Sequence, residues 1–410
     1  MMRNILQLLQ RYIFSVFLFF VVIDSTCAQS FLQFGVKKGD AWNKIKPYFN
    51  PPKEFKDQYG NYRSPLLFYN GDTVKTKQDW QKRHTEIYHQ WMSMMGDWPP
   101  LITNQKFEYL DSIKRENFIQ YKIRFYWTPN DQTEGYLLIP RIHGKKPAVV
   151  VVFYEPETAI GIGGKPNRDF AYQLAKRGFV ALSLGTTKTT KNKTYSLYYP
   201  SIENATIQPL STLAYAAANA WEVLAKVDDV DSTRIGIMGH SYGGKWAMFA
   251  SCLYEKFSCA VWSDPGIVFD ETKGSAVNYW EPWYLGYYPP PWTNTWRKKG
   301  LIENTKGLYP KLVRNGYDLH ELHALMAPRP FLVSGGSADP PERWIPLNHA
   351  LAINKLLGYR SRAAMTNRSE HDPNSESNEI IYSFFDWFLN SKSLVSGEKI
   401  YAKMKGNPFR

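Results

Sequence analysis

A serine between two glycines is the clearest nucleophile in the chain. Gly239-His240-Ser241-Tyr242-Gly243 follows the apolar run 234–238 and precedes a stretch of helical periodicity, so it has the pattern Gly-x-Ser-x-Gly between a strand and a helix. Side chains at the two glycines would strike the neighbouring strand and helix, and the serine is forced outward. We therefore interpret Ser241 as a nucleophile. The competing interpretation is an ordinary glycine-rich turn.

A serine hydroxyl is a poor nucleophile unless a base removes its proton, so a histidine should follow Ser241 in the chain. His371 lies in the loop after the apolar run 361–366, at an expected strand end. The carboxyl ends of parallel strands share one edge of a sheet, so His371 should converge on Ser241. His349 is less favoured because it falls inside the predicted helix 343–357.

The same reasoning requires an acid that orients the histidine. Asp339, in the loop after the run 329–334, is the preferred residue, and Asp264, at the end of the run 258–263, is the alternative. Asp372 and Glu370, beside His371, are weaker alternatives. Each of these carboxylates has a second interpretation, in which it only caps a turn.

The oxyanion of a tetrahedral intermediate needs two backbone donors. One should be the amide of Tyr242, and the other an amide directly after the run 148–154, near Tyr154 or Glu155. The glycine-rich segment 161–164 lacks the Lys-Ser/Thr of a phosphate loop, and the segment 320–323 lacks the His spacing of a zinc helix. We therefore expect no metal and no cofactor.

The elements that must position these residues form an alternating pattern. After Pro147, six apolar runs alternate with helical patterns, and a hairpin of 118–127 and 135–140 precedes them. This predicts an α/β fold, with a mostly parallel eight-stranded sheet and helices on both faces. The predicted strands are 148–154, 179–184, 234–238, 258–263, 329–334 and 361–366, and the predicted helices are 169–177, 210–226, 243–254, 343–357 and 376–390.

The remaining chain divides around this catalytic domain, which we place at 117–392. Residues 29–116 are expected to form an N-terminal extension packed on it, with one helix at 77–95, and 393–410 a C-terminal tail. The insertion 265–325, before the strand at 329, is far longer than an ordinary connection, which favours a cap over the site.

Tryptophans gather in and beside this insertion. Flat indoles stack on the apolar faces of sugar rings, so they favour a carbohydrate substrate, whereas the alternative is that they merely hold an irregular loop together. The candidate substrate-binding residues are Trp262, Trp280, Trp283 and Trp292.

The first 28 residues have the pattern of a secretory signal. Two arginines precede an eleven-residue apolar run, 13–23, which is shorter than the roughly 20 residues of a membrane span. Cleavage after Ala28 would start the mature chain at Gln29 and place it in the periplasm or outside the cell, without a stable membrane anchor. The two later cysteines, Cys252 and Cys259, leave a disulfide open.

The charge of the whole chain is +13. An exported basic protein meets anionic polysaccharide more plausibly than nucleic acid, although a solvated basic surface would give the same composition. We expect an oligosaccharide or polysaccharide substrate of acidic character. The oligomeric state stays open.

From about residue 117 to 390 the chain resembles the α/β-hydrolase superfamily, through the nucleophile motif and the order of Ser241, Asp339 and His371. Ala327-Pro328-Arg329-Pro330 and the exported context resemble bacterial acetyl xylan esterases, dienelactone-hydrolase-like esterases and glucuronoyl esterases. The resemblance implies a secreted serine esterase acting on acyl, including acetyl, or uronoyl esters of plant or algal polysaccharide. A serine peptidase of the prolyl oligopeptidase type and a non-catalytic polysaccharide-binding protein are the alternatives.

Resemblance to glucuronoyl esterases also bears on single residues. Lys245 matches a lysine of their nucleophile motif that contacts the uronic acid, and their usual acid corresponds to Asp264. Tyr242 departs from the family, which has an arginine directly after its serine.

Overall fold

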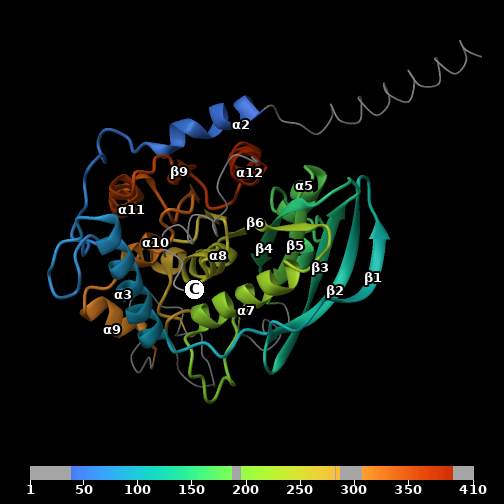
Figure 1. The fold of residues 1–410 in the computed structure, drawn as a ribbon, viewed down its shortest axis with the longest axis horizontal. Helices are drawn as coiled ribbons and strands as arrows, with labels where there is room; N and C mark the ends of the chain where they lie inside the picture. Colours follow the sequence, from blue (N-terminus) through green and yellow to red (C-terminus); the bar gives the residue numbers. More distant parts are fainter. Residues whose placement is uncertain (1–37, 187–194, 282, 287–306, 391–410) are drawn as a thin grey trace, which may run out of the picture.

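The centre of the protein is a nine-stranded sheet in the computed structural model, which describes residues 38–186, 195–281, 283–286 and 307–390 (Figure 1). The strand order across the sheet is β1-β2-β3-β5-β4-β6-β7-β8-β9. The strands are β1 Glu108–Lys114, β2 Phe118–Thr128, β3 Asp131–Pro140, β4 Lys146–Phe153, β5 Val180–Gly185, β6 Val230–His240, β7 Cys259–Ser263, β8 Phe331–Gly335 and β9 Ala363–Asn367.

The sheet is antiparallel at one edge and parallel elsewhere. β1, β2 and β3 pair antiparallel, β3 pairs antiparallel with β5, and all pairs from β5 to β9 are parallel. The α/β-hydrolase fold with its mostly parallel sheet is confirmed, but the predicted count of eight strands is wrong by one. The extra strand is β1, which has no buried residue and therefore no apolar alternation in its sequence.

Position 117 is therefore not the boundary of the sheet. β1 pairs with β2 and lies within residues 29–116, which were expected to form an N-terminal extension packed on the catalytic domain. The part of the chain before β1 contains α2 (Lys38–Ile45), the 3₁₀ turn Lys46–Phe49 and α3 (Lys77–Met95). α2 packs on α12 (Ser375–Leu389), where the rings of Trp42 and Trp387 are 5.0 Å apart.

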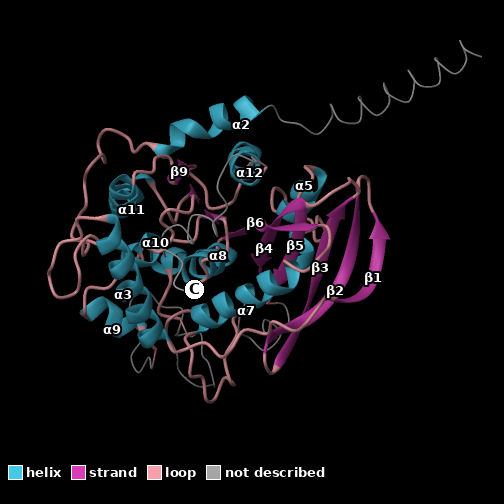
Figure 2. Cartoon of the chain, in the orientation of Figure 1, coloured by secondary structure: helices cyan, strands magenta, loops and turns pink. Residues whose placement is uncertain are grey.

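Helices cover both faces of the sheet, as expected, and Figure 2 shows α5 and α12 on one side of the strands and α7 on the other. One apolar core joins α3, α7, α8 and α11 to one face, and a second joins α2, α5 and α12 to the other. The bounds of these and the other helices are α4 Pro156–Ala159, α5 Phe170–Lys176, α7 Pro209–Leu224, α8 Tyr242–Leu253, α9 Tyr309–Arg314, α10 His320–Ala324 and α11 Trp344–Leu357. Two further 3₁₀ turns span Glu271–Val277 and Pro341–Arg343.

The central strand β4 shows why the sheet is covered twice. All eight of its residues are buried. Val150 and Val152 belong to one core, whereas Val149 and Val151 belong to the other, because successive side chains of a strand point to opposite faces. A continuous apolar run is therefore the pattern typical of a strand between two helical layers.

Two local signals delimit α3 where the sequence predicted it. Thr76 and Asp79 form a capping box at its start. Gly96 ends it with φ of 93°, and a Cβ at this position would lie 2.2 Å from the carbonyl oxygen of Thr206. Within the described residues, no helix is both long enough and apolar enough to cross a membrane.

Candidate active site

The nucleophile turn joins β6 to α8 at the carboxyl edge of the sheet. A Cβ on Gly239 would lie 2.1 Å from the carbonyl oxygen of Gly243, and a Cβ on Gly243 would lie 2.0 Å from that of Val152. Both positions therefore require glycine, as the motif predicted. Ser241 stands between them with φ of 57°, a strained conformation that its amide stabilises by donating to the carbonyl of Ser263 at 2.7 Å.

His371 lies in the loop after β9 and faces the serine. Its Nε2 is 2.8 Å from the Ser241 Oγ, and its Nδ1 is 2.6 Å from an oxygen of Asp264. In the tautomer that these contacts require, the Nδ1–H donates to the carboxylate and Nε2 accepts from the hydroxyl. The three side chains form a continuous hydrogen-bonded chain, although His371 lies more than 100 positions away in sequence from both Ser241 and Asp264.

The preference for Asp339 as the partner of His371 does not match the structure. Its carboxylate accepts from the amides of Gly266 and Ile267, both at 2.7 Å, and it therefore faces the loop after β7 instead of the histidine. The alternative, Asp264, occupies the expected position. Asp264 directly follows β7, the strand beside β6, with φ of 49°.

The two aspartates bind each other's loops. The Asp264 carboxylate accepts from the amides of Gly336 at 2.6 Å, Ala338 at 3.2 Å and Asp339 at 2.9 Å, while Asp339 binds the amides that follow Asp264. Burial, together with the nearby Asp264, raises the pKa of Asp339 to about 6. This reciprocal binding holds the loops after β7 and β8 together and leaves one oxygen of Asp264 toward His371.

Arg368 fixes the loop that carries the histidine. Its guanidinium donates to the carbonyl of His371 at 2.6 Å and to the carbonyl of Ser334 at 2.8 Å. Because Ser334 is in β8, this cation ties the His371 loop to the neighbouring strand. Sequence reasoning missed Arg368, although a cation at the carboxyl end of a strand, three residues before the histidine, was a visible signal.

His240 forms the wall behind the histidine, and it too was not singled out from the sequence. Its Nδ1 is 3.1 Å from the Ser263 Oγ, and its ring lies 4.9 Å from that of His371. Burial, reinforced by the nearby His371, Arg168 and Arg368, holds the pKa of His240 well below its usual range. A neutral ring therefore packs beside His371.

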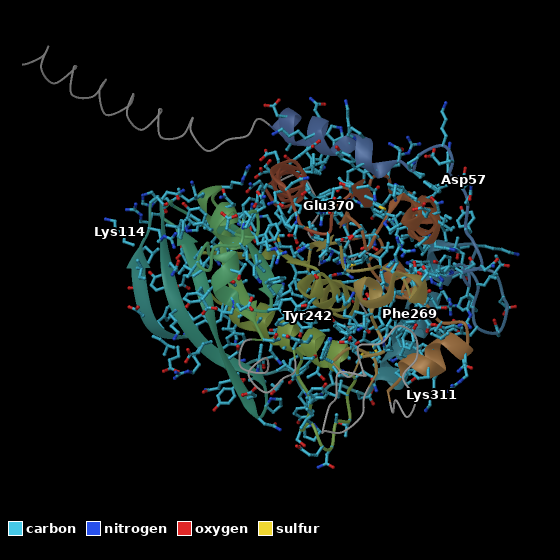
Figure 3. The ribbon with its side chains drawn as sticks, turned by 180° about the vertical axis from the view of Figure 1, so that it is seen from behind. Asp57, Lys114, Tyr242, Phe269, Lys311 and Glu370 are labelled. Atoms are coloured by element: carbon cyan, nitrogen blue, oxygen red, sulfur yellow. The ribbon has the colours of Figure 1, made fainter. Side chains whose placement is uncertain are left out.

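The two tyrosines predicted as oxyanion donors lie together. Tyr242 is the first residue of α8 and Tyr154 directly follows β4, and their rings stack with centroids 4.7 Å apart. Figure 3 shows Tyr242 in the middle of the molecule, far from Lys114 on the outermost strand. The amide of Tyr242 belongs to a helix N-terminus, which favours negative charge. The donor role of both amides stays a prediction.

Lys245 does not lie on the surface. Only 5% of it is exposed, its ammonium donates to the carbonyl of Pro265, and it lies 4.5 Å from the ring centroid of Tyr279. Burial lowers its pKa to about 8, against the opposing effects of Asp339 and Asp264. In the structure Lys245 therefore binds the loop that follows Asp264, whereas the resemblance to glucuronoyl esterases predicted a contact with substrate.

Three of the four tryptophans predicted to bind substrate lie within the described residues, and all three are buried. Trp262 is fully buried in β7, stacks on Phe331 at 4.5 Å and donates to Ser251, so its assignment as a substrate contact is wrong, because it packs in the core. Trp280 and Trp283 are also buried, which fits a packing role in the insertion. Trp292 lies outside the described residues.

The two cysteines after residue 28 and the potential metal ligands are placed as follows. Cys252 and Cys259 are buried free thiols and are not joined in a disulfide, and burial raises the pKa of both. Among the described residues there is no group of three or more histidine, cysteine or carboxylate side chains placed to hold a metal ion.

Two family models match parts of the chain. The prolyl oligopeptidase family matches residues 216–390, and the dienelactone hydrolase family matches residues 133–265. Both ranges include Ser241 and Asp264, and the first also includes Asp339 and His371. No curated protein sequence matches the chain.

Several solved structures share the fold. A glucuronoyl esterase from Solibacter usitatus is similar with a TM-score of 0.60 at 16% identity, over 82% of this chain and 100% of that one. A carbohydrate esterase family 15 glucuronoyl esterase from Caldicellulosiruptor kristjansonii gives 0.57 at 19% identity, over 84% and 97%. A candidate acetyl xylan esterase from Bacteroides fragilis gives 0.52 at 15% identity, over 90% of both chains.

These likenesses agree with the geometry at the carboxyl edge of the sheet. The structural similarity supports the fold, and both matched sequence families are hydrolase families. With Ser241 on the turn between β6 and α8, these findings support a serine hydrolase with the α/β-hydrolase fold.

Proposed function

We propose that the protein is a carbohydrate esterase that removes acyl or uronoyl ester groups from polysaccharide. The observation that carries this proposal is the hydrogen-bonded chain from Asp264 through His371 to the Ser241 hydroxyl. This arrangement is suited to acyl transfer through a covalent acyl-enzyme.

Each residue has one task in this reaction. The Ser241 oxygen attacks the ester carbonyl while His371 Nε2 takes the hydroxyl proton, and Asp264 stabilises the imidazolium that forms. The amides of Tyr242 and Tyr154 would receive the charge on the carbonyl oxygen. His371 then gives its proton to the leaving alcohol, and a water molecule activated by the same histidine releases the acid.

The structural neighbours support an ester bond as the target. Proteins named glucuronoyl esterases and a candidate acetyl xylan esterase share the fold over at least four-fifths of this chain. The position of Asp264 at the end of β7 also agrees with the acid that resemblance to glucuronoyl esterases implied. Both acyl and uronoyl groups stay within the proposal.

A serine peptidase is the second candidate, because the prolyl oligopeptidase family model covers residues 216–390. Such peptidases resemble this chain in the hydrolase domain and carry a propeller of repeated blades before it. Here the described residues from 38 to 107 contain two helices and a short 3₁₀ turn, without blade-like sheets. This favours the esterase.

The test compares three substrates: acetylated xylan, a methyl ester of glucuronic acid and a proline anilide. We expect the protein from Gln29 onward to release acetate from the first, or methanol from the second, and to leave the anilide intact. The Ser241→Ala variant should be inactive with an unchanged melting temperature. Anilide cleavage, or ester hydrolysis that survives in the variant, would overturn the proposal.

Export is part of the proposal, because the pattern of residues 1–28 predicts a cleaved signal. The expected result is an N-terminal sequence starting at Gln29 in protein recovered from the periplasm or the medium. Protein found only in the cytoplasm with Met1 retained would contradict export without affecting the esterase assignment.

A further inference from the structure

A basic cavity lies away from the candidate active site. Its volume is about 960 Å³, within the usual range of ligand sites, and its walls come from the segment 49–66 and from the end of α11 with the turn that leads to β9. Figure 1 shows the chain after α2 running down beside α11, so two segments distant in sequence form the cavity together.

The lining is strongly cationic. Lys56, Lys355, Arg360 and Arg362 line the cavity, against a single carboxylate, that of Asp57. Within the described residues none of the four cations forms an ion pair, whereas cations on the neighbouring elements do, as Lys44 does with Glu379. A concave surface with this excess of positive charge attracts anions.

Two buried polar atoms in this lining have no partner among the described residues. They are the Nε of Arg362 and the Oδ1 of Asn354. The amide nitrogen of Asn354 donates to Ala350, so this side chain is held in place with its oxygen left over. Buried donors and acceptors are normally paired, so the lining has hydrogen-bonding capacity that the described residues leave unused.

The walls are fixed before any ligand arrives. Asn348 donates to the carbonyls of Phe55 and Gln58, both at 2.7 Å, and His349 bonds the carbonyl of Tyr59 at 3.0 Å. These three contacts hold the 49–66 segment against α11. A preformed site binds more tightly because less ordering is needed.

Backbone strain is concentrated in this cavity as it is in the active site. Among the described residues, five other than glycine have positive φ, and two of them are Ser241 and Asp264. Two more, Asp57 at 59° and Ser361 at 56°, line the cavity. Such conformations gather at functional sites, where surrounding contacts compensate for their cost.

The cavity and the candidate active site lie at opposite ends of strand β9. Arg362 directly precedes β9, whereas His371 follows its other end. The five residues of β9 span roughly 16 Å, at about 3.3 Å per residue. A ligand in the cavity would therefore leave Ser241 free.

We propose that this cavity is a second binding site for an acidic oligosaccharide. The guanidinium groups of Arg360 and Arg362 would bind a uronate carboxylate, for which the planar fork is well matched. A sugar hydroxyl would donate to the Oδ1 of Asn354, and the rings of Tyr59 and Tyr359 would contact the apolar face of a sugar. The choice of an acidic sugar rests on the proposed function, whereas the site is distinct from the catalytic one.

Its role would be to hold a polymer chain while esters elsewhere on that chain are cleaved. Loss of the site should raise the KM for an acidic polysaccharide severalfold and leave kcat unchanged. Hydrolysis of a small aryl ester should not change, because such a substrate does not reach both sites.

The binding test uses calorimetry on the Ser241→Ala protein, which cannot consume its ligand. The probes are a hexamer of galacturonic acid, neutral xylohexaose and inorganic phosphate. We expect Arg360→Gln/Arg362→Gln to weaken binding of the acidic hexamer at least tenfold. The control Lys114→Gln/Lys145→Gln removes the same charge from exposed positions elsewhere and should change it less than twofold.

Arg362 packs over the rings of Tyr359 and Phe388, so its loss could unfold this corner of the protein. The variant Lys355→Gln/Arg360→Gln changes two exposed side chains only, and it should weaken binding severalfold without shifting the melting temperature.

Four results would overturn the inference: no binding of the acidic hexamer, equal weakening by the control, equal affinity for the neutral hexamer, or equal affinity for phosphate. Failure of the proposed function looks different, because esters would then stay intact while the cavity still binds the acidic hexamer. If esters are cleaved and the cavity variants bind like their parent, only the inference fails.

Discussion

The choice between the two aspartates leads to a prediction about Asp264→Asn. The carboxylate of Asp264 accepts from four donors: His371 and Ala338 on Oδ2, and Gly336 and Asp339 on Oδ1. An asparagine must present an NH₂ group to one of these pairs. It should face His371 and Ala338, because the hydrogen bond from the Ala338 amide is the longest of the three amide bonds, at 3.2 Å, and its removal costs least.

In that orientation the asparagine donates to Nδ1, and the imidazole must carry its proton on Nε2. His371 then faces the Ser241 hydroxyl with a donor and has no lone pair to take its proton. Loss of the correct tautomer costs about 10⁴-fold in kcat. This corresponds to roughly 5.5 kcal/mol of transition-state stabilisation.

The matched variant Asp339→Asn should behave differently. Asp339 accepts one amide on each oxygen, from Gly266 and Ile267, and it does not touch His371. An asparagine keeps one of these bonds, so we expect a loss of stability of about 1–3 kcal/mol and a fall in kcat of less than tenfold.

The assay is the initial rate of aryl acetate hydrolysis, with the melting temperature of each variant as the control for folding. A 10⁴-fold loss in Asp339→Asn with a small loss in Asp264→Asn would refute the reasoning, since it would mean that Asp339 orients the histidine. Equal losses in two folded variants would refute it as well, because the geometry gives only one aspartate a contact with His371.

Two further predictions concern packing and pH. Gly243→Ala should destabilise the protein by about 1–3 kcal/mol or more and lower its midpoint of urea unfolding, because the new Cβ would lie 2.0 Å from the Val152 carbonyl oxygen. The control Gly39→Ala, whose Cβ would meet nothing within 4 Å, should leave the urea midpoint unchanged or raised. Equal shifts of the urea midpoint in the two variants would contradict this prediction. Burial lowers the pKa of Lys245 from 10.5 to about 8, so between these pH values the unfolded chain binds more protons than the folded protein. The free energy of unfolding should therefore rise with pH across this range by roughly 3 kcal/mol relative to that of Lys245→Met. Parallel curves of unfolding free energy against pH for the two proteins would argue against a buried lysine.

Much of the fold followed from the sequence because its signals are local. The alternation of apolar runs and helical patterns predicted β2 to β9 and the helices α3, α5, α7, α8, α11 and α12 within a few residues of their observed bounds. The strand β1 was missed because both of its faces meet solvent, so its side chains show no alternation, and only its pairing with β2 makes it a strand.

The roles of several side chains were decided only by the tertiary structure. Sequence composition showed that tryptophans gather near the insertion, but it could not show that Trp262 points into the core. Lys245 was similarly ambiguous. Its place on α8 was predictable, whereas its bond to the Pro265 carbonyl depends on the path of a loop from another strand.

Sequence alone determined that Ser241 stands on a glycine turn between a strand and a helix and that His371 follows a later strand, since both depend on short patterns. It also reduced the acid to a few carboxylates. Only the tertiary structure decided that Asp264 faces His371, because a carboxylate turns toward the donors that surround it, and the amides around Asp339 belong to the loop after β7. Those donors lie in a loop more than 70 positions away in sequence, beyond the reach of any local pattern.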